Sequence, residues 1–180
     1  MKSLVTIFAG LLLVAIAGAV ILFFGLYDFG ADAPHWAPLE HAIAFARARA
    51  VTVQARAVVV PPFNAGMLAD GASDYDAMCT SCHLAPGMEE NEMRPGLYPH
   101  PPTFERFAAL NAAEQFWVIK HGFKMSGMPA WGRTHSDAEI WNMVAFLQKL
   151  PGMTPAAYRA LTKAAEGHHD MDHMDMDHHK

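Results

Sequence analysis

The pentapeptide Cys-Thr-Ser-Cys-His at positions 79 to 83 constrains the chain most, because it holds both cysteines of the 180 residues. A disulfide between Cys79 and Cys82 would close a very small loop and restrict the unfolded chain little. A dithiol oxidoreductase motif is expected beside a βαβ pattern, and no period-two run predicts strands here. A structural zinc site needs a full tetrahedral ligand set, and the folded part offers no second cysteine pair or close histidine pair.

Covalent haem is the chemistry that uses all three of these side chains. In a C-x-x-C-H motif the two thiols add to the vinyl groups of a haem, and the adjacent histidine becomes an axial ligand of the iron. The sequence therefore predicts one haem c, attached through Cys79 and Cys82 and ligated by His83.

The second axial ligand is expected far along the chain, in the stretch Lys-Met-Ser-Gly-Met-Pro-Ala-Trp-Gly from position 124 to 132. Met128 stands between a glycine and a proline, a loop context suited to presenting a thioether. A His/Met pair raises the reduction potential and suits an electron carrier. The alternatives are that Met128 only packs in the core, or that His121 or His135 supplies a nitrogen ligand instead.

The N-terminal segment predicts a membrane anchor. Roughly 24 residues from Leu4 to Tyr27 carry no charge, and as a helix they would span about 36 Å, against a hydrocarbon core of about 30 Å. A cleaved signal peptide is the alternative, but the small-residue site Ala31-Asp32-Ala33 is followed by Pro34. Lys2 favours a cytoplasmic N-terminus, which predicts a single-pass protein of the bacterial inner membrane whose soluble domain lies in the periplasm.

A linking helix is predicted after the anchor, ending at the two prolines 61 and 62. Its apolar or small residues recur at alternating steps of four and three, which is the spacing of a helical stripe. Such a stripe either packs on the protein's own domain or docks on a partner or membrane surface. Its members are Leu39, Ile43, Ala46, Ala50, Val53, Ala57 and Val60.

Further helices are predicted from capping signals, and the fold class is therefore all-α. A short helix from Gly71 to Cys79 delivers the cysteines. Asn111 with Glu114, and Ser136 with Glu139, have the spacing of N-terminal caps followed by a helix. Thr154 followed by Pro155 predicts a C-terminal helix. The loop from 84 to 102 has no periodicity, so something other than regular structure must hold it.

Together these motifs resemble a class I c-type cytochrome. The pattern comprises Gly71, Tyr75 and the C-x-x-C-H motif, then Gly-Met-Pro-Ala-Trp-Gly, then a last helix reading Ala-Glu-Ile-Trp-Asn-Met-Val-Ala-Phe-Leu-Gln-Lys-Leu. The similarity covers about residues 68 to 150 and is greatest to the monohaem domain of cbb-type oxidase subunit III. It implies a small fold wrapped around the haem, which then serves as the core.

The resemblance also implies particular contacts. The first helix should cross the last, so that Gly71 and Tyr75 meet Val144, Phe146 and Leu147. The family's axial methionine matches Met128. A proline carbonyl should orient the ligand histidine, and the candidates are Pro95, Pro99 and Pro101. The tryptophans at 117, 131 and 141 are expected to pack on the haem or to donate to its propionates.

The C-terminal tail, residues 168–180, contains five histidines, three methionines and four aspartates and is expected to be disordered. Copper is the metal that can use both imidazole and thioether ligands, although the tail can instead be merely solubilising. The candidate ligands are His168, His169, Met171, His173, Met174, Met176, His178 and His179. The formal charge of −5 and the absence of a basic cluster exclude a nucleic-acid partner.

The predicted layout is an anchor over 1–33, a linking helix over 34–67, a cytochrome c domain over 68–152, a C-terminal helix over 153–167 and the tail. The predicted function is single-electron transfer between redox proteins, with no enzyme activity. The expected partners are a membrane oxidase or a cupredoxin. Two alternatives stay open: a haem peroxidase or gas sensor with a labile methionine ligand, and a copper-handling protein that uses its tail.

Overall fold

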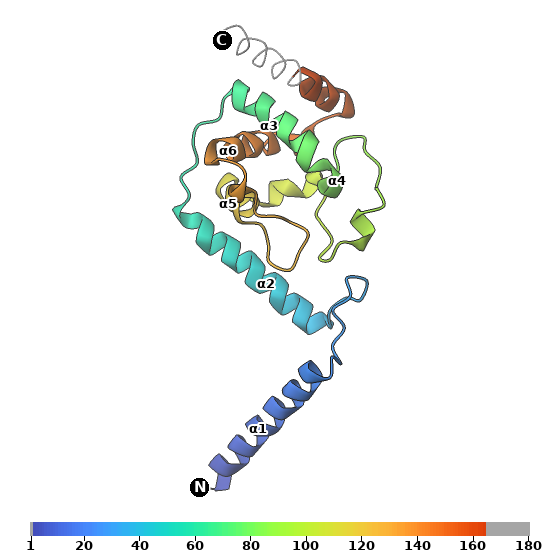
Figure 1. Cartoon of the computed structure of the whole chain (residues 1–180). Coiled ribbons are helices and arrows are strands. Elements are labelled where there is room, and N and C mark those ends of the chain that lie inside the picture. Colours follow the sequence, from blue (N-terminus) through green and yellow to red (C-terminus); the bar gives the residue numbers. More distant parts are fainter. Residues whose placement is uncertain (1, 165–180) are drawn as a thin grey trace, which may run out of the picture. The chain divides into compact units, whose positions relative to one another are not determined.

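The computed structural model describes residues 2–164 and divides into two compact units, with the boundary after Pro34. Every regular element in these residues is a helix, as predicted, and none is a strand (Figure 1). The predicted copper ligands of the tail lie outside the described residues.

The first unit consists mainly of α1, Lys2–Phe23. Its 22 residues correspond to about 33 Å of helix. Within the described part of the chain it is the one helix long and apolar enough to cross a membrane. It ends before Tyr27, the last residue of the predicted span, because the chain turns at Gly25, whose φ is +61°.

The second unit starts with α2, Ala37–Gln54, which continues into the short 3₁₀ turn η1, Ala55–Ala57. The linking helix is therefore present, but it ends before the prolines. It packs on its own unit against α5 through Val51 and Ala55, which are 3% and 4% exposed. The predicted stripe is not the face that packs, because Leu39, Ile43, Val53 and Val60 each keep about two fifths of their surface exposed. Its docking on a partner or membrane surface stays a prediction.

The centre of the second unit is the crossing of α3, Ala65–Met78, with α6, Asp137–Leu147 (Figure 1). At Gly71 the backbones touch, since a Cβ there would lie 1.9 Å from the carbonyl oxygen of Asn142. Tyr75 packs on Phe146, with ring centres 5.4 Å apart. The predicted crossing is confirmed, but Gly71 meets the backbone of Asn142 and Met143 rather than the side chain of Val144.

Helix α5, Ala112–His121, and helix α6 both begin with the predicted capping box. The Asn111 side chain accepts from the Glu114 N–H, and the Glu114 carboxylate accepts from the Asn111 N–H. Ser136 and Glu139 repeat this arrangement, and hydrogen bonds from the backbone and hydroxyl of Ser136 hold the pKa of Glu139 below its usual value. Such caps satisfy N–H groups that a helix leaves unpaired at its start.

Short elements complete the unit. They are α4, Thr80–His83, and four 3₁₀ turns: η2, Arg94–Gly96; η3, Phe104–Ala109; η4, Trp131–Arg133; and η5, Leu150–Gly152. The chain is helical again over 155–164, where the Thr154 hydroxyl accepts from the Ala157 N–H as predicted. This helix belongs to the same core, because Tyr158 is buried and its hydroxyl donates to Asp76.

Candidate functional site

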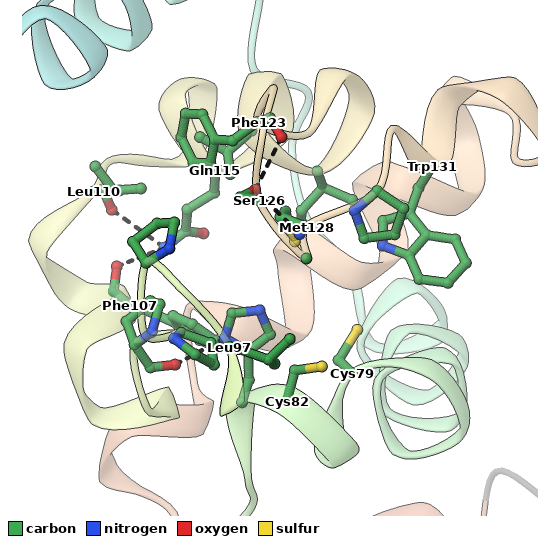
Figure 2. A pocket seen from close by; sticks show the side chains of 18 of the residues that line it. Cys79, Cys82, Leu97, Phe107, Leu110, Gln115, Phe123, Ser126, Met128 and Trp131 are labelled. Atoms are coloured by element: carbon green, nitrogen blue, oxygen red, sulfur yellow. Dashed lines mark hydrogen bonds between the residues drawn. The ribbon is translucent and has the colours of Figure 1, made fainter. Parts of the chain in front are cut away.

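A large apolar pocket lies inside the second unit, with about 1080 Å³ of empty space, part of it open to solvent. The four residues predicted as haem ligands, Cys79, Cys82, His83 and Met128, all line it. Figure 2 shows Met128 across the pocket from the two cysteines. The fold thus gathers side chains that are some 45 positions apart in the sequence.

Helix α3 and the following turn deliver the cysteines. The Cys79 N–H donates to the Tyr75 carbonyl at the end of α3, and the N–H groups of Cys82 and His83 both donate to the Cys79 carbonyl. The motif is thereby wound into a single turn that presents both thiols, which are free, to the same pocket. A vinyl-bearing ring in this pocket would meet the two thiols along one edge.

Burial, and then the nearby Asp74 and Cys82, together raise the pKa of the Cys79 thiol to about 12. A thiol with so high a pKa is protonated at neutral pH and is a poor nucleophile for disulfide exchange. The dithiol oxidoreductase alternative is therefore disfavoured. No group of three or more His, Cys, Asp or Glu side chains in residues 2–164 is arranged so that it could hold a metal ion, so the zinc alternative finds no ligand set there.

His83 is oriented by a backbone carbonyl. Its Nδ1 lies 2.7 Å from the carbonyl oxygen of Pro102. A carbonyl can only accept, so Nδ1 carries the proton and Nε2 keeps a lone pair for a metal. Burial lowers the pKa of His83, which keeps the ring neutral and able to ligate. The proline carbonyl expected from the resemblance exists, but it belongs to Pro102, and the choice of Pro95, Pro99 or Pro101 is wrong.

Arg94 holds the loop that carries Pro102, and sequence reasoning missed it. The residue is 2% exposed, and its side chain donates to the carbonyls of Cys82, at 2.9 Å, and Pro101, at 3.3 Å. It also lies 2.9 Å from Nε2 of His100 and pairs with the carboxylate of Glu90. The arginine therefore ties the C-x-x-C-H turn to the proline-rich loop. Its only signal in the sequence was a single basic residue between a run of glutamates and a proline-rich stretch.

Met128 is held by a short turn after α5. The Met128 N–H donates to the Ser126 hydroxyl, which donates to the Phe123 carbonyl, and the Phe123 N–H donates back to the Met128 carbonyl. Gly122 permits the return of the chain, because its φ is +60° and a Cβ there would lie 2.6 Å from the Met128 carbonyl oxygen. The thioether thus has a fixed backbone, whereas Met125 points outward and is 84% exposed.

The remaining walls come from the long loop, α5 and α6. Gln115, 4% exposed, donates to the carbonyls of Phe107 and Leu110 and so ties η3 to α5 (Figure 2). Of the three tryptophans expected near the haem, Trp131 lines the pocket. Trp141 instead stacks on Phe116, with ring centres 4.2 Å apart, and Trp117 packs against His121. His121 and His135, the alternative nitrogen ligands, do not line the pocket.

Residues 66–147 match the family model of cytochrome c oxidase, cbb3-type, subunit III. This match is consistent with a class I c-type cytochrome domain over these residues. Domains of this family are haem-containing electron-transfer modules, and the covalent haem c they carry fits the pocket in its apolar lining and in its donor set. The match begins after α2 and ends at the last residue of α6, so the linking and C-terminal helices lie outside the matched segment. No curated protein is significantly similar to the chain.

Proposed function

We propose that this protein is a membrane-anchored monohaem cytochrome c that carries single electrons between redox partners in the periplasm. Cys79 and Cys82 would hold the haem through two thioether bonds, each formed by adding an S–H across a vinyl group. His83, through Nε2, and Met128, through its sulfur, would bind the iron. When bound between an imidazole and a thioether, haem iron supplies one-electron chemistry at a raised potential.

The observation that carries the proposal is the convergence of these four side chains on one apolar pocket, with the His83 ring already oriented by Pro102. Neither ligand needs a rearrangement to reach the pocket. A position between two protein ligands leaves the metal no open site for a substrate, which favours an electron carrier over an enzyme.

The backbone around Met128 bears on the rival in which this ligand dissociates readily, as in a peroxidase or gas sensor. Three hydrogen bonds, between Met128, Ser126 and Phe123, close the turn that presents the sulfur. Displacing the methionine would require this turn to open. The geometry therefore favours stable six-coordination.

Covalent attachment and ligation can be tested on the full chain expressed with a haem c maturation system. A pyridine haemochrome spectrum should show haem c in the wild type, and C79A/C82A should lose covalent haem. The ferric protein should show the weak near-red sulfur-to-iron band, which Met128→Ala should abolish. Met125→Ala is the matched control, because Met125 is three positions away and exposed. A wild type without the band, or M128A retaining it, would refute the ligation.

Helix α1 supports the membrane and periplasmic parts of the proposal, since its length matches a bilayer and Lys2 precedes its apolar run. Protease treatment of intact spheroplasts should digest the cytochrome domain, while the same treatment of intact cells should spare it. Protection of the domain in spheroplasts would place it in the cytoplasm and contradict the proposal.

The tail is proposed to capture copper, and this proposal rests on its composition alone. A tail that binds copper would suit a cupredoxin or a copper-containing oxidase as the partner. Calorimetric titrations of Cu(I) and Cu(II) should show additional copper bound by the full chain, compared with a chain ending at residue 167. Identical titrations would remove copper from the proposed function and leave the electron carrier.

A further inference from the structure

One lining residue of the pocket comes from α2, which lies outside the segment that matches the cytochrome family. Arg47 lines the pocket from this helix. Its guanidinium carbon lies 5.6 Å from the centre of the Phe123 ring, a cation–π distance, and the side chain is half-buried. The linking helix therefore contributes a fixed positive charge to a pocket that is otherwise apolar.

Arg47 has no anionic partner in the part of the chain that the structure describes, since no described carboxylate pairs with it and the lining residues include no Asp or Glu. The other charged or titratable lining groups are Cys79, Cys82, His83 and His100. The His100 Nε2 already accepts from Arg94, which does not itself line the pocket. A buried or half-buried cation is stabilised when an anion lies nearby, so this wall suits an anionic group of the occupant.

The position of Arg47 indicates which part of a haem it would meet. Figure 2 shows Phe123 on the side of the pocket away from Cys79 and Cys82. In a haem c the two thioether carbons lie on one edge of the porphyrin, and the two propionates lie on the opposite edge. The Phe123 ring, with Arg47 against it, therefore lies away from the thioether edge, so a propionate is the anionic group of a haem that could reach Arg47.

We propose that Arg47 binds a haem propionate, so that the linking helix is part of the haem site and raises the reduction potential. This inference rests on the haem of the proposed function. A cation close to the iron disfavours the ferric state, which carries one more positive charge than the ferrous state. Docking of α2 on the cytochrome domain, through Val51 and Ala55, then sets both the position of the charge and its electrostatic effect.

The test compares midpoint potentials of the full chain in four variants. Arg47→Gln and Arg47→Met remove the charge, and the methionine stem still covers Phe123. Arg47→Lys keeps the charge. Arg49→Gln is the matched control, because Arg49 is exposed on the same helix, does not line the pocket and gives the same change in net charge. R47Q and R47M should shift the potential to more negative values, several times further than R49Q, and R47K should stay near the wild type.

A second readout reports the propionates directly. In a redox-difference infrared spectrum, the carboxylate bands of haem labelled with ¹³C at its propionates should move in R47Q and R47M and not in R49Q. Equal potentials and unchanged bands in R47M and R49Q, with the sulfur-to-iron band intact, would overturn the role of Arg47. A wild type without covalent haem in the pyridine haemochrome assay would instead overturn the proposed function itself.

Discussion

The histidine side and the methionine side of the pocket are held in different ways. On the histidine side, Pro102 reaches His83 from 19 positions away, and Arg94 ties the intervening loop to the carbonyls of Cys82 and Pro101. On the methionine side, the bonds run between Phe123, Ser126 and Met128, within a few positions of one another.

This difference has a consequence for stability. Contacts between distant segments form only when the whole unit folds, so breaking them should destabilise the domain globally. Contacts inside one turn can open while the rest stays folded, because local opening costs less than global unfolding. The histidine side should therefore control stability, and the methionine side should control access to the metal.

The largest effect is expected at Arg94. Arg94→Met keeps the length of the side chain but leaves the carbonyls of Cys82 and Pro101 without their charged donor. Loss of one partner in such a buried network costs about 2 to 4 kcal/mol. Denaturant unfolding of the ferric protein at neutral pH should show this loss. Arg106→Met, at an exposed arginine in η3, is the control, and a loss in R94M no greater than in R106M would contradict the global role of this side.

An intermediate and local effect is expected at Ser126. Ser126→Ala removes the acceptor of the Met128 N–H and the donor to the Phe123 carbonyl. The free energy of opening the turn should fall by about 1.4 kcal/mol, which raises the open fraction about tenfold. Imidazole should therefore bind the ferric protein about tenfold faster, as followed by stopped-flow absorbance. Global stability should fall by no more than this same amount, about 1.4 kcal/mol, and so by less than in R94M.

Ser126→Thr supplies the control, since it keeps the hydroxyl and should bind imidazole at close to the wild-type rate. The proposed division between the two sides fails if S126A destabilises the domain as much as R94M does, or if imidazole binds S126A no faster than the wild type.

The smallest effect is expected at Tyr75, whose hydroxyl donates to the Leu84 carbonyl at 2.6 Å, directly after His83. Tyr75→Phe should cost about 1 kcal/mol at pH 7. Burial, then the neighbouring Cys79, raises the pKa of Tyr75 above its usual value of about 10. The unfolded chain therefore ionises first, and the stability that Tyr75 contributes is present below pH 10 and is lost as the pH rises above it.

Unfolding followed by circular dichroism from pH 7 to 11 should show the gap between wild type and Y75F closing above pH 10. Burial, and then the hydrogen bond to Asp76, also raise the pKa of Tyr158. The stability that Tyr158 contributes is therefore lost at high pH in both proteins and does not change the gap between them. Tyr98→Phe, the same substitution at another tyrosine, is the control for the pH dependence of this gap. A gap that stays constant across this range would argue against a buried, protonated Tyr75 on the histidine side.

The features predictable from the sequence were those encoded over a few positions. The capping boxes at Asn111 and Ser136 fixed where two helices begin, because the side chains that satisfy the first N–H groups are adjacent to them in sequence. The C-x-x-C-H motif encoded its own winding into one turn. The crossing of α3 and α6 at Gly71 followed from the family pattern, since only a glycine allows backbones to approach so closely.

The features missed depend on distance in space. Any of the prolines in the long loop could have faced His83, and Pro102 does so because Arg94 shapes the loop from its buried position. The stripe on the linking helix had the right spacing but the wrong orientation, since its alanine-rich faces differ little in apolar area and Val51 and Ala55 pack on α5 instead.

The sequence by itself determined the all-helical fold, the apolar N-terminal helix and the chemistry of the four candidate ligands, because each depends on residue type and short-range spacing. Only the tertiary structure decided which carbonyl orients the histidine, which tryptophan lines the pocket, and that α2 places Arg47 in its wall. Those outcomes depend on how elements far apart in sequence pack together, and packing is set by the shape of the whole core rather than by any one segment.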